Sequence, residues 1–295
     1  MQKLKPARDY AGQIEQLEKE HALIIDDHVE AIQILSTVSY YRLSAYGIGI
    51  KCAENTEHYL PGITLRHLYR LHQFDSRFRT LLMPLIETLE IELRTKIAYH
   101  LVMTYGADVL YNELNFQLLE RKDGKTWHSW LLCQFKNEMD RQKDKPLVRH
   151  HIEKYGGRFP LWAAVELFSF GMLSTLYKIM KEEDKVAVAK QFSTATKYMK
   201  SWILALLEVR NMCAHYGRLY NMPLMQSPRL YGENTKYRSN RVFPLLLTIR
   251  RMLGKRQEWT TFYTSLIGLM DEYPEVRLSF IGFPVEWREC LEIPT

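Results

Sequence analysis

The chain has 295 residues, of which 46% are hydrophobic and 25% are charged, and its formal net charge is +6. This composition is typical of a folded globular protein and argues against an intrinsically disordered chain. The longest apolar runs, such as FPLLLTI, are far shorter than the roughly 20 residues that span a membrane, so we expect no membrane partner. The mild positive charge permits a polyanionic partner without requiring one.

The four cysteines lie far apart and form no C-x-x-C pair: Cys52, Cys133, Cys213 and Cys290. Their spacing indicates neither a zinc site nor a disulfide framework, and reduced thiols in a cytoplasm are the simplest interpretation. The first ten residues, MQKLKPARDY, lack the apolar stretch of a signal peptide. We therefore expect a cytoplasmic protein that needs no metal and no cofactor.

Helical periodicity dominates the first part of the chain. Two helices are predicted within YAGQIEQLEKEHALI and DHVEAIQILSTVSYYRLSAYG. The second is expected to have Asp26 or Asp27 as its N-cap and to end at Gly47. A longer helical region is predicted from Thr64 to Tyr105, and Pro84 is expected to break or kink it.

The second part of the chain is also helical in pattern. PLWAAVELFSFGMLSTLYKIM begins at Pro160 and predicts a core helix. The next helix is predicted from about Ala195 to Tyr216, and VFPLLLTIRRMLGK and EWTTFYTSLIGLMDEY form later helical segments. Because strand patterns are scarce, the sequence predicts an all-α protein. We expect a small N-terminal helical region over residues 1–60 and a larger helical domain over residues 61–295.

The stretch EVRNMCAHYGRLYN, residues 208–221, carries the most distinctive polar residues. Its apolar and aromatic side chains, including Tyr216 and Tyr220, cluster around one side of the predicted helix, and Arg210 lies at the flank. At about 100° per residue, four polar side chains fall within about 80° of one another on the opposite face: Glu208, Asn211, His215 and Arg218.

This set has the chemistry to cleave RNA without a metal ion. RNA carries its own nucleophile, the 2′-OH, and a histidine can remove its proton near neutral pH. An arginine can stabilise the charge that builds on the phosphate, and Asn211 can orient the imidazole or bond the phosphate.

Spacing alone is weak support for that chemistry. Similar Arg/His spacings recur elsewhere in the chain: Arg66 and His72, Arg94 and His100, and Arg121 and His128. An ordinary solvated helix face and a polar network inside a helical bundle are therefore alternatives to a catalytic site.

RNMCAHYGRLYN resembles the Arg-Asn-x-x-x-His signature of HEPN ribonucleases, and CAHYGRLYN resembles the Abi-like abortive-infection branch, the AbiD/AbiF group. The resemblance extends over about residues 25–222 and rests on several independent motifs. Three further segments are similar to that group in the same order: SYYRLSAYG at 39–47, FDSRFRTLLMPLIETLEIELRTKIAYHL at 74–101 and FPLWAAVELFSFGMLSTLY at 159–177.

The resemblance implies a HEPN-type helical bundle and a metal-independent endoribonuclease of phage defence (abortive infection) or of a toxin–antitoxin system. Carried onto this chain, the catalytic residues are Arg210 and His215, with Asn211 as their neighbour. The resemblance also implies a homodimer in which two Arg/His sets form one site. The implied partners are the substrate RNA and a small non-coding RNA, which can also act as the antitoxin.

Several other residues are candidate RNA contacts. Arg218, Tyr220 and Asn221 belong to the signature of the branch, and Glu166 matches a polar element of the preceding helix. Two tyrosines and an arginine follow one another at Tyr40, Tyr41 and Arg42. They can stack on bases and pair with a phosphate, or they can form a packed helix end.

The charged residues of the long helix have a more structural interpretation. Ion pairs are expected to join Glu90 or Glu92 to Arg94 or Lys96. Arg77 and Arg79 are candidates for a second basic patch. For the whole protein, a ribonuclease is the leading hypothesis, and a non-catalytic RNA-binding scaffold and a helical protein-interaction module are the alternatives.

Overall fold

The computed structural model describes residues 6–293, and its ordered elements are helices. Within these residues there is no β-strand, only isolated bridges. This confirms the predicted all-α fold. None of the helices in this range is both long enough and apolar enough to cross a membrane.

The N-terminal helices are α1 (Tyr10–Lys19), α2 (His28–Thr37) and α3 (Tyr40–Ser44), followed by the 3-10 turn η1 (Ala45–Gly47). The N-cap of α2 is the second of the two predicted aspartates, whose side chain accepts two backbone N–H groups. The prediction of one uninterrupted helix up to residue 47 is wrong. The backbone becomes extended at residue 38, and the side chain of Ser39 caps a new helix.

The longest element is α4 (Leu65–Tyr105), a helix of 41 residues that continues through Pro84. Of the two predicted effects of this proline, the break is therefore wrong, and the kink stays a prediction. A proline inside a helix costs about 3 kcal/mol, whereas each fully buried leucine or isoleucine contributes about 1.5–3 kcal/mol. Leu82, Leu85 and Ile86, which lie beside the proline, are almost completely buried. This burial offsets the cost of the proline.

The predicted core helix after Pro160 is divided into three parts. These are α7 (Leu161–Ala164), the 3-10 turn η4 (Val165–Leu167) and α8 (Phe170–Ile179). The backbone is extended just before α8, where a serine side chain caps the new helix. Arg94 of α4 donates to two backbone carbonyls around this interruption, so the break is stabilised from outside the helix.

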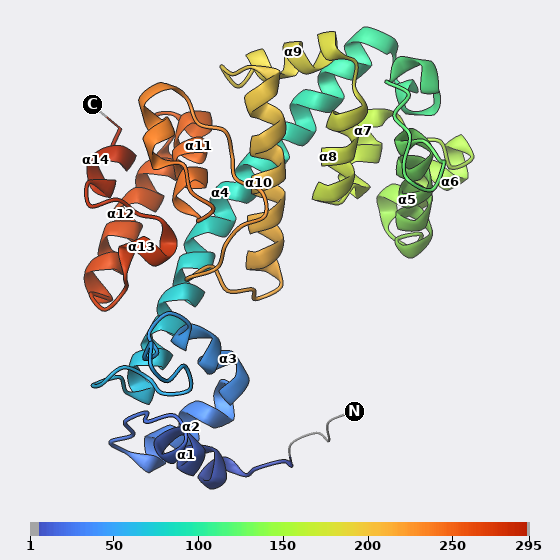
Figure 1. The fold of residues 1–295 in the computed structure, drawn as a ribbon. Coiled ribbons are helices and arrows are strands. Elements are labelled where there is room, and N and C mark those ends of the chain that lie inside the picture. The colour runs from blue at the N-terminus through green and yellow to red at the C-terminus, as the bar shows by residue number, and fades with distance from the viewer. Residues whose placement is uncertain (1–5, 294–295) are drawn as a thin grey trace.

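Figure 1 shows α4 passing through the middle of the molecule, with the N-terminal helices near one end and helices α5 to α9 near the other. Helices α10 and α12 pack directly against α4. The remaining bounds are α5 (Trp127–Arg141), α6 (Pro146–Tyr155), α9 (Glu182–Lys190), α10 (Thr196–Ala214), α11 (Phe243–Leu253), α12 (Gln257–Glu272), α13 (Leu278–Ile281) and α14 (Trp287–Leu291), with 3-10 turns η2 (Val109–Tyr111), η3 (Glu113–Asn115) and η5 (Gly232–Tyr237).

Buried side chains from both predicted regions belong to one hydrophobic cluster. Leu43 and Tyr46 of the N-terminal part join Leu71 and Phe74 of α4 in it. The division at residues 60 and 61 stays a prediction, and residues 1–5 and 294–295 of the two ranges lie outside the described part of the chain.

Candidate active site at the end of α10

The helix that carries the Arg-Asn-x-x-x-His motif ends one residue before His215. The Tyr216 N–H donates to the Cys213 carbonyl at 3.3 Å, and the Gly217 N–H donates to the Met212 carbonyl at 2.7 Å. This pair of bonds is the Schellman arrangement that terminates many helices. The motif histidine therefore sits where α10 gives way to a turn, not inside a helix face.

His215 and Asn211 are both exposed. The imidazole of His215 makes no hydrogen bond or ion pair within residues 6–293, so both ring nitrogens are available to a ligand. Glu208, which the helical wheel places on the same face, is used differently. Its carboxylate accepts the backbone N–H groups of Met225 and Gln226 at 2.8 and 2.7 Å, and so holds the loop that follows the site.

Tyr216 adopts a left-handed backbone conformation, with a φ of 57°, and its side chain is 71% exposed. This conformation costs a residue other than glycine roughly 1–2 kcal/mol. Placing Tyr216 on the buried side of the helix is wrong, because the chain leaves the helix before this residue. Gly217 follows because a Cβ there would lie 3.1 Å from the Met212 carbonyl oxygen. Strain of this kind is frequent at functional sites.

Asp75 and Arg79 of α4 hold the backbone that follows the helix. The fully buried Asp75 accepts the N–H groups of Leu219 and Tyr220 at 2.9 and 2.8 Å. Arg79 is paired with Asp75 and donates to the Gly217 carbonyl at 3.1 Å. The prediction of Arg79 as part of a basic patch is wrong, because its side chain is buried. The Asp75–Arg79 ion pair could have been predicted from the sequence, because the two opposite charges are four residues apart on a predicted helix.

The three signature residues beyond the histidine also make structural contacts. Arg218 donates to the Ala45 carbonyl, and the Asn221 side chain donates to the Ile48 carbonyl at 2.6 Å. Tyr220 is only 1% exposed. Placing Arg218 on the polar helix face is wrong, because the helix ends before it. These residues position the segment after α10, and their contact with RNA stays a prediction.

Arg210 is held from α4 by a carboxylate. Its Nε lies 3.5 Å from Glu90 Oε2, and its Nη1 lies 3.4 Å from Asn211 Oδ1. Glu90 also pairs with Arg94 at 2.8 Å. The Arg210 side chain remains 35% exposed. The guanidinium is therefore positioned by protein contacts and still accessible to an anion.

The charged residues of α4 around this contact follow the predicted pairing. Arg94 pairs with Glu90, and Lys96 pairs with Glu92 at 2.5 Å, which confirms the expected ion pairs four residues apart. Arg94 also donates to the carbonyls of Val165 and Phe168, which lie before and after Glu166 in the chain. The exposed side chain of Glu166 makes no hydrogen bond or ion pair in the described structure, so its role at the site stays a prediction.

Arg42 links the N-terminal helices to the motif, across 174 residues of sequence. Its Nη1 donates to the Tyr216 carbonyl at 2.8 Å, next to the candidate catalytic histidine. Beside it, burial and the charges of Arg42 and Arg79 lower the pKa of His72 to about 4. His72 is therefore uncharged at neutral pH. The exposed side chain of Arg42 places a second cation near the end of α10, in addition to Arg210.

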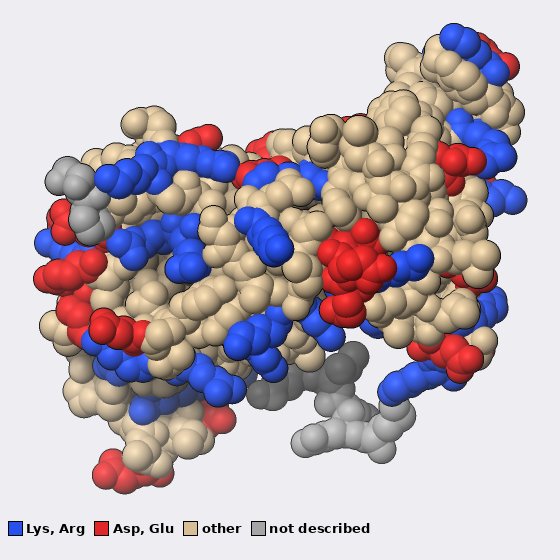
Figure 2. Space-filling model, turned by 90° about the horizontal axis from the view of Figure 1, so that it is seen from above, with Lys and Arg blue, Asp and Glu red and all other residues tan. Residues whose placement is uncertain are grey.

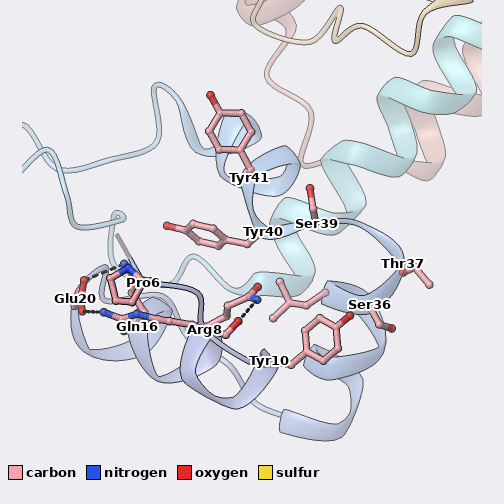
Figure 3. Close-up of a pocket in the computed structure, with 12 residues that line it drawn as sticks. Pro6, Arg8, Tyr10, Gln16, Glu20, Ser36, Thr37, Ser39, Tyr40 and Tyr41 are labelled. Carbon is pink, nitrogen blue, oxygen red and sulfur yellow. Dashed lines mark hydrogen bonds and ion pairs between the residues drawn. The ribbon is translucent and has the colours of Figure 1, made fainter. Parts of the chain in front are cut away.

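Tyr40 and Tyr41 line a cavity of ≈ 890 Å³ formed with α1 and α2 (Figure 3). The Tyr40 hydroxyl lies 3.1 Å from His21 Nε2, and its ring is half-buried, as expected of a packed helix end. Tyr41 is 86% exposed, and Figure 3 shows its side chain pointing away from the other labelled residues. The two neighbours therefore differ: the first is mainly structural, and the second is free to stack on a ligand.

Charge is dispersed over the one face of the molecule that Figure 2 shows. On the face shown in Figure 2, Lys and Arg side chains lie in several separate groups with Asp and Glu between them. Within residues 6–293, no group of three or more His, Cys, Asp or Glu side chains has the arrangement of a metal site.

The fold and site define an all-α protein that exposes an Arg-Asn pair and a histidine at the end of one helix. A family model described as Abi-like protein matches residues 33–221, more than half of the chain. The chain therefore belongs to the Abi-like protein family, and this membership suggests a role in abortive-infection defence. No curated protein and no solved structure matches it.

Proposed function

We propose that this protein is a HEPN-type, metal-independent endoribonuclease of the AbiD/AbiF group. We assign it to phage defence by abortive infection or to a toxin–antitoxin system, with a small non-coding RNA as partner. The observation that carries the proposal is the end of α10, where His215, exposed and without a side-chain partner among the described residues, follows the positioned Arg210 by five residues. Family membership supports the defence role.

In the proposed reaction, His215 removes the proton of a ribose 2′-OH. The 2′ oxygen attacks the adjacent phosphorus, and the bond to the 5′ oxygen breaks. Arg210 stabilises the negative charge on the phosphate with its planar donors. Asn211, whose Oδ1 lies 3.4 Å from the Arg210 guanidinium, orients this group. A proton must also reach the leaving 5′ oxygen, which calls for a separate acid.

A second chain can supply that acid. Apolar side chains beside the motif are exposed, among them Tyr216, Met222 and Met225, and such patches are typical of contacts with a partner. In a two-fold homodimer the same patch meets itself, so the two histidines would approach one groove. Arg42 and Tyr41 lie beside this groove in the proposal, where they pair with a phosphate and stack on a base of the RNA.

The products test the chemistry. Cleavage by this route leaves a 2′,3′-cyclic phosphate and a 5′-OH, and it continues in EDTA. We would incubate end-labelled RNA with the wild-type protein and the His215→Ala variant, and identify the ends by mass spectrometry. Products with 5′-phosphates, or a strict requirement for magnesium, would contradict the proposal.

Mixed dimers test the composite site. Wild-type and His215→Ala chains with different tags would be co-expressed, and the mixed dimers purified and assayed. If both histidines are needed, the mixed dimer is strongly impaired. Half of the wild-type activity would instead mean that each chain cuts alone, and an active monomer would reject the composite site.

The runner-up is a non-catalytic RNA-binding scaffold. The basic side chains on the face shown in Figure 2 and the exposed Tyr41 are compatible with RNA binding that involves no cleavage. Sequencing the RNA that co-purifies with His215→Ala, together with an assay of the wild-type protein on that RNA, separates the two functions. Intact RNA after incubation with the wild-type protein favours the scaffold.

A further inference from the structure

A second cavity, of ≈ 470 Å³, lies at the opposite end of α10 from the motif. At 1.5 Å per residue, the 19-residue helix separates the two places by about 28 Å. Segments 117–119, α8, α9 and the start of α10 line this cavity. Its most abundant charged residues are lysines: Lys178, Lys185, Lys197 and Lys200.

The charge inside this lysine cavity is only partly neutralised. Its one carboxylate, Glu182, accepts from Lys185 at 2.8 Å and from the Gln117 amide at 3.1 Å. The other three lysines have no ion pair with a carboxylate in the described part of the chain. Burial, and next the nearby charges of Lys200 and Arg121, lower the pKa of Lys178, so other cations lie close to this lysine.

A buried hydroxyl in the same cavity has no partner. Tyr177 is 2% exposed, and its hydroxyl makes no hydrogen bond with any described residue. Buried hydroxyl groups are nearly always paired, so an unpaired one that lines a cavity indicates a missing acceptor. Burial raises the pKa of Tyr177, so this group stays protonated and can donate.

The start of α10 adds further donors. The helix begins at Thr196, which lines the cavity, and its N-cap Ala195 has no side chain that could satisfy the first N–H groups. The N-terminus of a long helix carries a partial positive charge and favours anions. Lys178 Nζ lies 3.4 Å from the centre of the Trp127 ring, a contact that does not neutralise its charge. A hydroxyl donor, three ammonium groups that have no carboxylate partner among the described residues and a helix N-terminus together match the acceptor oxygens and negative charge of phosphate.

We propose that this lysine cavity binds a phosphate-bearing ligand. The ligand is either a free nucleotide or a phosphate of an RNA chain, because both present the same group. The inference does not depend on the ribonuclease proposal, since none of its residues belongs to the motif at the other end of α10.

The binding test uses the full chain and isothermal titration calorimetry with inorganic pyrophosphate. We expect one saturable site per chain, with an affinity that falls as salt is raised. Competition then identifies the source. Displacement by ATP but not by a short 2′-O-methyl RNA, which cannot be cleaved, assigns the site to a nucleotide. Displacement by the RNA assigns it to an RNA phosphate. Failure of pyrophosphate, ATP and the RNA to bind overturns the proposal.

Charge variants test the location. Lys178→Gln combined with Lys200→Gln should weaken pyrophosphate binding about tenfold or more, because two charge-assisted contacts are lost. The matched control is Lys143→Gln combined with Lys190→Gln, which removes the same charge from exposed positions outside the cavity. Equal loss of affinity in both double variants would mean that net charge alone attracts the anion, and would overturn the site.

Tyr177→Phe separates a ligand contact from a structural role. Removing an unpaired buried hydroxyl should leave the melting temperature of the ligand-free protein unchanged or raise it. Pyrophosphate affinity should fall severalfold, and the rise in melting temperature caused by pyrophosphate should shrink. A lower melting temperature with unchanged affinity would show that the hydroxyl has a structural partner, and would overturn its part in the site.

Discussion

Two Arg/His pairs of nearly equal spacing lie in very different surroundings. Arg94 and His100 are in the interior of α4, where the first pairs with Glu90 and the second lies 2.8 Å from the buried Asp184. Arg210 and His215 are at the end of α10, and the imidazole of His215 is exposed and unpaired in the described structure. The spacing in sequence therefore does not distinguish the two pairs. They differ in whether their side chains are already bound to other residues or are free to bind a ligand.

One carboxylate, that of Glu90, contacts the arginine of each Arg/His pair. Glu90 lies between Arg94 and Arg210, so the structural arginine and the candidate catalytic arginine are positioned by one group. Arg94 also donates to two backbone carbonyls, whereas the side chain of Arg210 remains 35% exposed. An arginine can bind a substrate only if its contacts within the protein leave some of its N–H donors unused.

The largest effect is expected for His215→Ala. If the comparison is correct, RNA cleavage falls by about 10²–10⁴-fold, because a general base is lost. The free energy of unfolding should change by less than about 0.5 kcal/mol, since the side chain is exposed and unpaired. Cleavage assays and urea denaturation measure the two quantities. As a core control, Val209→Asp should unfold the protein, and similar destabilisation by both variants would make His215 structural.

Asp75→Asn tests the anchor that holds the segment after His215. The variant leaves Arg79 buried without its counter-charge and weakens the bonds to Leu219 and Tyr220. We expect a loss of about 3–5 kcal/mol in the free energy of unfolding. Asp123→Asn, at an exposed ion pair, is the matched control and should leave the midpoint of urea denaturation nearly unchanged. Equal effects would mean that Asp75 is not an anchor.

His100→Ala is the counterpart on α4. It removes a partner of Asp184, which is 2% exposed and, among the described residues, keeps only the Tyr105 hydroxyl as a side-chain donor. The expected cost is about 1–3 kcal/mol in stability, measured by urea denaturation. The folded variant should cleave RNA at the wild-type rate. Loss of cleavage with full stability would erase the distinction between the two histidines.

Tyr216→Asn is expected to have the smallest effect on folding. Asparagine tolerates the left-handed conformation better than tyrosine does, so the melting temperature should stay the same or rise slightly. If the exposed ring contacts RNA or a second chain, RNA affinity or dimerisation should weaken at the same time. Fluorescence anisotropy and analytical ultracentrifugation detect these changes. Unchanged binding in both assays would leave the strained tyrosine without a contact role.

The sequence by itself determined the helical class, the family and the residues of the motif. Periodicity of apolar residues requires no knowledge of distant contacts, and the motif residues lie within one short stretch. The Glu90–Arg94 pair was predictable for the same reason, since its members are four residues apart on one helix. The places where helices continue or stop were not predictable in this way. Helix α4 continues through Pro84, whose neighbours on both sides are buried, and the break before α8 is stabilised by Arg94.

Only the tertiary structure decided which polar residues are available. The helical wheel treated the chain up to Tyr220 as one helix, whereas the Schellman turn at Tyr216 ends α10 and changes the direction of the chain after it. Arg42 reaches this turn from 174 residues away, and Asp75 holds the segment from within α4. Such contacts depend on how helices pack against one another. No local sequence pattern encodes that packing. The sequence therefore identified the residues of the motif, but it could not show which of their side chains have no contacts with other residues.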